Sequence, residues 1–391
     1  MALNLPVYLD NHSTTRVDPR VVDAMLPYFR GDYGNAASRQ HEFGWRAEAA
    51  VELARKQVAD LIGAAAEEVV FTSGATESIN LALKGVAGAN SHRGRHIVTA
   101  ATEHRAALDT CQRLERYGFS VTRVPVDRHG LLAVQDVAAA MTSGTILVSV
   151  MTANNEIGTV APVEEIASVC RKAGVLFHSD ATQAVGKIAV DVRRLGVDLL
   201  SFSSHKMYGP KGVGALYIRS SQPKIRLETQ IDGGGHEHGL RSGTLNVPGI
   251  VGFGKAAELA MQECESDGER TARLRGKLVA AILQELEEVK VNGHPSRRLP
   301  NNASLTFAHT KADTVMMEMK DVAVSSGSAC SSALPEPSHV LRAIGLSNAE
   351  VLASLRFGLG RFTTEEEIDF AAGRVVEAVK RVRSRMMAMT E

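Results

Sequence analysis

The stretch VDLLSFSSHKMYGPKGVGALYI, residues 197–218, carries the clearest fold signal in the chain. Its apolar ends, residues 197–202 and 213–218, are typical of two buried strands. Lys206 lies between them, at the end of the first strand, in a turn rich in Gly and Pro. A lysine held near a core loses hydration, which lowers its pKa and makes the amine a usable nucleophile. The simple alternative is a solvated loop lysine, which is the more common case for a lysine taken at random.

On both sides of this stretch, short apolar segments alternate with helical patterns. Strands are predicted at residues 68–72, 96–100, 120–124, 145–150, 175–179, 199–202 and 215–218, and helices at 43–62, 78–85, 106–117, 132–141 and 163–173. Asp18 and Pro19 predict the N-cap and the first residue of another helix. Because continuous apolar strands that alternate with helices form parallel sheets covered on both faces, we expect an α/β fold with a mostly parallel sheet.

The chain of 391 residues is too long for one compact core. A helical stretch at residues 248–289 marks the passage to a second domain, with strands near 303–307 and 322–325 and a last helix from 365 to about 387. We therefore predict a large domain over residues 16–260 and a smaller α+β domain over residues 261–391. The N-terminal segment, residues 1–15, is expected to join the small domain.

Composition and charge exclude several classes of protein. Lys plus Arg and Asp plus Glu both number 44, so the formal net charge is zero and nothing predicts binding to nucleic acid or a membrane. No signal peptide and no apolar run long enough to span a bilayer are found. Cys111, Cys170, Cys264 and Cys330 are too scattered for a disulfide framework or a metal site. We therefore expect a cytoplasmic protein without a bound metal ion.

Candidate site residues lie where the predicted strands end, which is where open α/β sheets bind ligands. Residues 73–78 (SGATES) follow a strand and open a helix, an arrangement that binds anions, although many α/β turns share it. Asp180 ends an apolar run, and taken alone it is more simply a helix N-cap. A pyridine cofactor needs an amine for a Schiff base and a carboxylate at its ring nitrogen, and Lys206 with Asp180 meets both needs.

Taken together, eight segments resemble the fold-type I pyridoxal phosphate enzymes of the class-V aminotransferase family, and among them the cysteine desulfurases of iron–sulfur cluster assembly. They are residues 71–78 (FTSGATES), 102–104 (TEH), 154–158 (NNEIG), 180–183 (DATQ), 203–206 (SSHK), 241–244 (RSGT), 325–330 (SSGSAC) and 356–361 (RFGLGR). The match covers nearly the whole chain. The resemblance implies a homodimer that uses pyridoxal phosphate to remove sulfur from L-cysteine and leaves L-alanine.

The resemblance also assigns roles around the cofactor ring. It implies that Lys206 holds pyridoxal phosphate as a Schiff base and later moves the α-proton, while Asp180 holds the ring nitrogen. His104 would stack on the ring and assist proton transfer. Gln183 and Asn155 would meet the phenolic oxygen, with Asn155 also near the substrate.

The phosphate of the cofactor would be held by a second group of residues. By resemblance these are Ala75, Thr76, Ser203 and His205, joined by Thr244 from the other subunit. A surface histidine, or a core histidine with satisfied hydrogen bonds, would be the simpler interpretation of His205 or His104 outside these motifs.

Two further residues would act on the substrate. Cys330 lies in a predicted Ser/Gly loop, and the resemblance makes it the nucleophile that takes the sulfur as a persulfide. An incidental cysteine is the alternative, which we favour for Cys111, Cys170 and Cys264 because they fall within helical patterns. Arg356 would bind the α-carboxylate through its planar guanidinium, although a surface arginine is the simple alternative.

The sequence departs from the family at two places. His12, Ser13 and Arg16 stand where relatives have small residues and a proline, in a loop expected near the site. Relatives that pass sulfur to a scaffold protein carry a longer C-terminal tail with a tryptophan. This sequence lacks that tail, which bears on docking of a sulfur acceptor or scaffold but not on the chemistry.

Two other functions fit parts of the pattern. Another pyridoxal phosphate lyase, such as a selenocysteine lyase, would share most of these residues, and comparing amino-acid with selenocysteine substrates would separate the two. A catalytically silent sulfur-assembly partner is the alternative from another class. The presence of Lys206, Asp180 and Cys330 argues against it.

Overall fold

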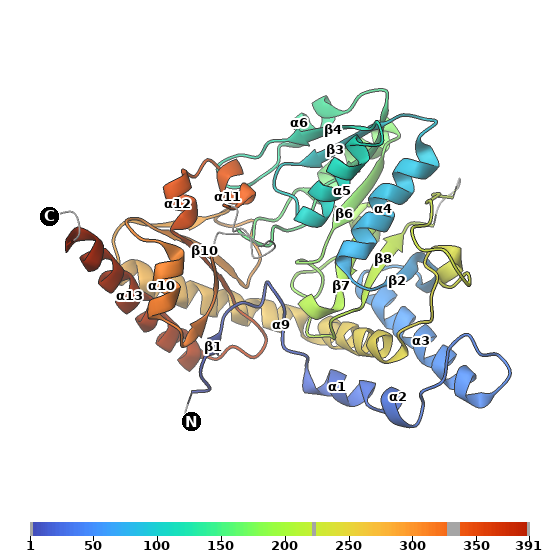
Figure 1. Cartoon of the computed structure of the whole chain (residues 1–391), viewed down its shortest axis with the longest axis horizontal. Coiled ribbons are helices and arrows are strands. Elements are labelled where there is room, and N and C mark those ends of the chain that lie inside the picture. Colours follow the sequence, from blue (N-terminus) through green and yellow to red (C-terminus); the bar gives the residue numbers. More distant parts are fainter. Residues whose placement is uncertain (1–2, 221–223, 327–336, 389–391) are drawn as a thin grey trace.

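The computed structural model describes residues 3–220, 224–326 and 337–388, and it confirms the α/β fold (Figure 1). In these residues a seven-stranded sheet has the order β2-β8-β7-β6-β5-β3-β4. Its strands are β2 (Val69–Thr72), β3 (His96–Ala100), β4 (Ser120–Val124), β5 (Thr145–Ser149), β6 (Leu176–Asp180), β7 (Leu199–Ser203) and β8 (Gly214–Ile218). The five strands from β4 to β7 are parallel, whereas β8 is antiparallel to both neighbours.

Helices cover both faces of this sheet because alternate residues of its strands face opposite sides. Val70, Leu147 and Leu216 pack against α4 (Ala75–Asn90) and α5 (Arg105–Glu115). Phe71 and Val148 belong to the opposite core. The helices that contribute to that core are α3 (Glu42–Leu61), α6 (Val134–Ala140), α7 (Val163–Ala173), α8 (Val192–Leu195) and the first half of α9 (Val247–Glu285).

A second sheet lies beyond the middle of α9 (Figure 1). It is antiparallel, has the order β12-β13-β10-β9, and consists of β9 (Val289–Asn292), β10 (Asn302–Phe307), β12 (Ser325–Ser326) and β13 (Ser354–Gly358). The second half of α9, α10 (Ala312–Glu318) and α13 (Glu365–Ala388) form a core with it. The remaining short helices here are α11 (His339–Ala343) and α12 (Asn348–Leu352).

The N-terminus joins the second sheet and then crosses to the first. Strand β1 (Val7–Tyr8) pairs in parallel with β11 (Val322–Ala323). The chain then reaches α1 (Pro19–Met25) and α2 (Pro27–Arg30), beside the large sheet. As predicted, Asp18 is the N-cap of α1 and accepts a hydrogen bond from Arg20 N, and Pro19 is the first helical residue.

Several predicted boundaries were wrong, and for β9, β11 and β12 a distant partner strand decides the local structure. The helix expected over 248–289 ends at Glu285, and the residues that follow form β9 against β10. The strand expected over 322–325 is divided between β11, which pairs with β1, and β12, which pairs with β13. Helix α4 begins three residues earlier than expected, at Ala75, and Arg356 lies within β13, a strand that was not predicted.

A buried polar chain crosses the centre of the large sheet. His178 on β6 is fully buried, with its Nδ1 2.8 Å from Ser149 Oγ on β5 and its Nε2 2.9 Å from Ser201 Oγ on β7. Burial lowers the pKa of His178 to about 3. The ring is therefore neutral near pH 7, with one nitrogen donating to a serine and the other accepting from one.

We expect the free energy of unfolding to fall as the pH drops from about 6.5, partly because of His178. Since the folded pKa of about 3 lies below the unfolded value of about 6.5, the unfolded chain binds the extra proton between these limits. His178→Gln should reduce the slope by up to about 1.36 kcal/mol per pH unit in urea denaturation between pH 4 and 6.5. Exposed His92→Gln is the control and should keep the wild-type slope. An unchanged slope for His178→Gln would contradict this account.

Candidate active site

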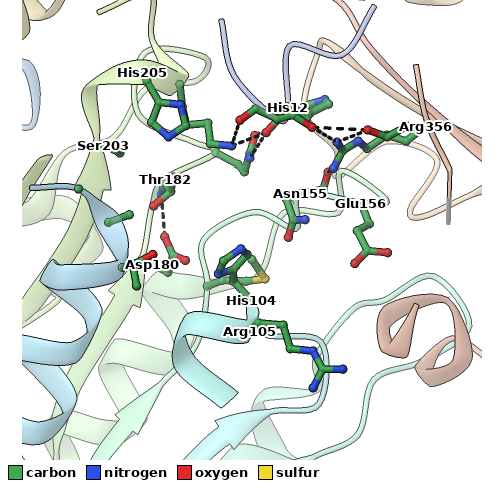
Figure 2. A pocket seen from close by; sticks show the side chains of 18 of the residues that line it. His12, His104, Arg105, Asn155, Glu156, Asp180, Thr182, Ser203, His205 and Arg356 are labelled. Atoms are coloured by element: carbon green, nitrogen blue, oxygen red, sulfur yellow. Dashed lines mark hydrogen bonds between the residues drawn. The ribbon is translucent and has the colours of Figure 1, made fainter. Parts of the chain in front are cut away.

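A cavity of about 690 Å³ lies where β5, β6 and β7 end, facing β13 and the N-terminal segment (Figure 2). It brings together most of the site residues predicted from the sequence. Those that line it are Ala75, Thr76, His104, Asn155, Asp180, Gln183, Ser203, His205, Lys206 and Arg356. Thr244 is exposed and does not line this cavity, and Cys330 lies outside the described residues.

The turn that carries the lysine is held by the N-terminal segment. Strand β7 ends at Ser203, and a single 3-10 turn, η2 (Ser204–Lys206), follows it. Thr15 donates to His205 O from both its backbone nitrogen, at 3.0 Å, and its hydroxyl, at 2.9 Å. The same hydroxyl accepts from Tyr208 N at 2.8 Å, and Tyr208 has a positive φ of 65°. These bonds fix the backbone on both sides of the lysine.

Lys206 points into the cavity from this turn. Its Nζ donates to the carbonyl oxygens of His12 at 2.5 Å and Ser13 at 2.7 Å. Burial, reinforced by the positive charge of Arg356, lowers the pKa of Lys206 to about 8. Near neutral pH the uncharged fraction of the amine, which attack on a carbonyl requires, is therefore far larger than that of an ordinary lysine.

Asp180 ends β6 and is a buried carboxylate, 4% exposed. Its Oδ1 accepts from Thr182 N at 2.9 Å, and among the described residues it forms no ion pair. A buried carboxylate without a cation is costly unless a ligand supplies a charged donor. The protonated ring nitrogen of a pyridine cofactor is such a donor, so this residue fits the expected pyridoxal phosphate.

His104 lies beside Asp180 in the lower part of the pocket (Figure 2). It is the N-cap of α5, and its Nδ1 accepts a hydrogen bond from Ala106 N at 3.1 Å. Burial lowers the pKa of His104, so the ring is neutral near pH 7 and carries its proton on Nε2. The Nε2 proton is the one this ring offers to a ligand.

The start of α4 forms an anion site at another edge of the cavity. Gly74 is its N-cap and provides no side-chain cap, which leaves the N–H groups of the first turn for a ligand. Glu77 does not fill this site, because its carboxylate accepts from Ser73 N at 2.8 Å and pairs with Arg241 at 2.8 Å. A Cβ added at Gly74 would approach within 3.8 Å of Ser203 Oγ, across the space expected for a phosphate.

His205 and Lys211 also line the cavity. Burial, followed by the charges of Lys206 and Lys211, lowers the pKa of His205 to about 4. Its Nδ1 lies 3.1 Å from Thr14 Oγ1. The ring is therefore neutral, and Lys211 is a cation here that the sequence did not single out.

Arg356 is fixed from several directions where β13 meets the cavity (Figure 2). Its Nη2 donates to Asp10 Oδ1 at 2.9 Å, Ser13 Oγ at 2.8 Å and Ser325 Oγ at 3.0 Å. Its Nη1 donates to Asn155 O at 3.0 Å. Its Nε is buried and has no partner among the described residues. The guanidinium is thus held rigidly, and its Nε–H is left for a ligand.

The sequence missed several residues of the site. Asp10, the ion-pair partner of Arg356, belongs to the polar run at residues 10–15. The high density of polar residues directly after a predicted strand was the sequence signal that could have identified Asp10 as a site residue. His12 and Ser13 of the run do line the cavity, whereas Arg16 lies outside it with its guanidinium 5.3 Å from the Phe362 ring centre.

Glu156 and His339 also line the cavity without having been predicted. Glu156 accepts a hydrogen bond from Ser338, and His339 Nε2 donates to Glu103 O at 2.9 Å. Within the described part of the chain, no cluster of three or more His, Cys, Asp or Glu side chains could hold a metal ion. The same residues contain no helix long and apolar enough to cross a membrane.

Comparison with known proteins agrees with this geometry. The family model for Aminotransferase class-V matches residues 7–370. The chain is 56% identical over 381 residues to "Cysteine desulfurase IscS" of Anaeromyxobacter dehalogenans, covering 97% of this chain and 94% of that protein. A solved structure titled "NIFS-LIKE PROTEIN" superposes with a TM-score of 0.89 at 39% identity, covering 96% and 99% of the two chains. Another, titled "SspA in complex with cysteine", has a TM-score of 0.81 at 36% identity and covers 92% and 100%.

We expect Lys206 to react with pyridoxal phosphate at a lower pH than an ordinary lysine. Cofactor-free protein should take up pyridoxal phosphate, and borohydride should then fix it covalently, with a rate midpoint near pH 8 because burial lowers the pKa to about 8. An unperturbed lysine would give a midpoint near about 10.4. Mass spectrometry of the trapped protein measures both the rate and the site. Lys206→Ala should trap none, and trapping in that variant would remove Lys206 from this role.

Proposed function

Since the chain belongs to the aminotransferase class-V family, and within it to the pyridoxal phosphate-dependent cysteine desulfurases of the iron–sulfur cluster assembly type, we propose that Lys206, Asp180 and Arg356 form its catalytic centre. One observation carries the proposal. A single cavity joins an amine whose pKa is lowered to about 8, a buried carboxylate without a cation and a rigidly held guanidinium. These are the groups needed to hold a pyridine aldehyde and an amino acid side by side.

Each of these residues has a role that follows from its position in the cavity. When bound, pyridoxal phosphate supplies an electron-withdrawing ring that acidifies the Cα–H bond of an attached amino acid. Asp180 keeps the proton on the ring nitrogen, and Lys206 Nζ accepts the α-proton and returns it to the product. Arg356 binds the α-carboxylate, because a planar guanidinium suits a carboxylate and its Nε is unused in the structure. His104 would stack on the ring of the bound cofactor and offer it the Nε2 proton.

Two further groups of residues would bind the phosphate and the phenolic oxygen of the cofactor. The first turn of α4, with Ala75 and Thr76, and the side chains of Ser203 and His205 bind the phosphate. All four residues line the cavity, and Gly74 at the start of α4 faces Ser203 Oγ, which supports this role. Asn155 and Gln183 meet the phenolic oxygen at the other side of the ring.

Sulfur leaves the substrate through Cys330. Its thiolate attacks the sulfur of L-cysteine, the bond between Cβ and sulfur breaks, and the electron pair of that bond is taken up by a proton at Cβ. The balanced change is L-cysteine plus the Cys330 thiol to L-alanine plus a Cys330 persulfide. The persulfide then passes to a sulfur acceptor or an iron–sulfur scaffold protein.

A homodimer is supported by an exposed apolar patch. Phe29, Tyr33, Phe43 and Trp45 are each exposed by about half or more of their surface, and the Tyr33 and Phe43 rings lie 5.4 Å apart. They cluster around α2 and the start of α3, at one end of the molecule (Figure 1). Patches of this kind mark protein interfaces. Thr244, exposed and outside the cavity of its own chain, would complete the phosphate site of the partner subunit.

We also propose a division of the chain into domains and a cellular location for the protein. A large domain over residues 16–260 and a small one over 261–391, with residues 1–15 on the small one, is supported by the separate cores beside the seven-stranded and four-stranded sheets and by the pairing of β1 with β11. Because Cys111, Cys170 and Cys264 are free thiols, a reducing compartment such as the cytoplasm suits the protein.

Cys330→Ala should separate cofactor chemistry from sulfur release. The variant should bind pyridoxal phosphate and change its absorption when L-cysteine is added, because neither step needs a thiol. Alanine production should fall by roughly a hundredfold or more, since water or free thiol replaces a held nucleophile poorly. Cys264→Ala is the matched control and should keep wild-type alanine production. Alanine formed by Cys330→Ala at the wild-type rate would show that sulfur leaves without a persulfide.

Charged residues in the apolar patch should dissociate the dimer. Phe29→Asp with Tyr33→Asp places two carboxylates in an interface of the size expected for obligate dimers, roughly 2,000 Å² or more. Sedimentation velocity should show a monomer with little activity. Met317→Asp, at an equally exposed apolar residue on α10, should remain dimeric. A double variant that sediments as a dimer would place the interface elsewhere, and a fully active wild-type monomer would end the dimer proposal.

A further inference from the structure

His12 belongs to the polar run at residues 10–15 and is almost completely buried, 2% exposed, at the wall of the cavity. It lies between His205, which precedes Lys206, and Arg356 (Figure 2). Its backbone oxygen accepts a hydrogen bond from Lys206 Nζ, and its other hydrogen bonds are made with one residue, Gln183. His12 Nδ1 lies 2.9 Å from Gln183 Oε1, and Gln183 Nε2 donates to His12 O at 3.0 Å.

These two bonds determine which way the Gln183 amide faces. The backbone oxygen of His12 only accepts hydrogen bonds, so the end of Gln183 beside it must be the NH₂ group. The other end is therefore the amide oxygen, which also only accepts, and His12 Nδ1 must carry a hydrogen. Both heteroatoms of Gln183 are thus oriented by a single residue.

The protonation of His12 agrees with this arrangement. A cationic ring would also carry a hydrogen on Nε2, which is buried and has no partner among the described residues. Burial, followed by the positive charges of Arg356, Lys206 and Lys187, lowers the pKa of His12 to about 3. The ring is neutral, with its one hydrogen on Nδ1 and directed at Gln183.

One hydrogen of the Gln183 NH₂ group remains unused. The first is donated to His12 O, and no acceptor for the second is found in the described part of the chain. Because Gln183 is itself buried at the cavity wall, 7% exposed, this second N–H is available to a ligand in the cavity. A freely rotating glutamine would offer its oxygen as readily as its nitrogen.

We propose that His12 is a positioning residue that fixes Gln183 so that its amide presents an N–H group, and not its oxygen, to the phenolic oxygen of the bound cofactor. The proposal rests on the contact between Gln183 and the cofactor given above, and it adds the residue that enforces the polarity of that contact. An N–H donor stabilises an anionic oxygen, whereas an amide oxygen in the same place would repel it. His12 therefore acts through Gln183 and need not touch the cofactor or the substrate.

The visible absorption of the cofactor-loaded enzyme is expected to change with pH, and the pH midpoint of that change reports the charge on the cofactor. This midpoint tests the proposal. His12→Ala keeps the backbone oxygen of residue 12 but removes the Nδ1–H that holds the Gln183 amide oxygen. If that side-chain bond is what keeps the Gln183 N–H directed at the cofactor, the midpoint should rise by about one to two pH units, since a lost hydrogen bond to a charged group changes an equilibrium about ten- to a hundredfold. Gln183→Ala should give the same shift, and the double variant should shift no further. His12→Asn, whose side-chain NH₂ group can replace Nδ1–H, should keep the wild-type midpoint. Urea unfolding of each variant checks that it is folded.

Each other outcome overturns the proposal. An unchanged midpoint in folded His12→Ala would show that Gln183 does not need His12. If the midpoint shifts of the two single variants add in the double variant, the two residues act separately. The same conclusion follows if His12→Ala shifts the midpoint but Gln183→Ala does not. A folded His12→Asn with the midpoint of His12→Ala would show that the donor to Gln183 is not what matters. Alanine production by the wild type tests the proposed function independently, so either proposal can fail alone.

Discussion

The backbone of residues 7–18 is hydrogen-bonded to both sheets, and the geometry of the cavity depends on this bridge. On the small sheet, Gly358 N donates to Leu9 O at 2.7 Å, and Asn11 N donates to Gly358 O at 3.1 Å. On the large sheet, Thr15 binds the turn of the lysine, as described above. Arg356 lies on one sheet and Lys206 on the other. One short stretch of backbone therefore sets the separation between the Arg356 and Lys206 side chains.

A network of ion pairs holds Asp18, at the C-terminal end of this segment. Arg361, whose side chain is 8% exposed, pairs with Asp18 at 3.0 Å, Glu263 at 3.2 Å and Asp267 at 2.7 Å. Hydrogen bonds from Arg20 lower the pKa of Asp18 to about 2, so its carboxylate stays charged. Removing one partner of such a network leaves a buried charge unpaired, which is far more costly than a surface pair is worth. The network thus ties α1, α9 and the end of β13 to the same point.

The elements predicted from sequence were those with strong local patterns. Strands β3 and β4 and helix α7 have the predicted bounds, because apolar periodicity and Gly174 after α7 specify them locally. Strands β9 and β13 were missed, since each is short and exists because β10 offers it a partner. In the site, Lys206 and Asp180 could be identified because they end apolar strands. The pairing of Arg356 with Asp10, 346 positions apart, has no local signal, and neither has the tautomer of His12.

Helix α9 is a single element of 39 residues, roughly 60 Å long at about 1.5 Å per residue. Its first half contributes Phe253 and Ala257 to the core under the large sheet, and its second half contributes Leu278 and Ile282 to the core under the small one. Neither core can lose its packing without releasing a helix on which the other also depends. The two halves of the chain are therefore expected to unfold cooperatively as one unit, and partial opening would be confined to segments that contact neither end of this helix.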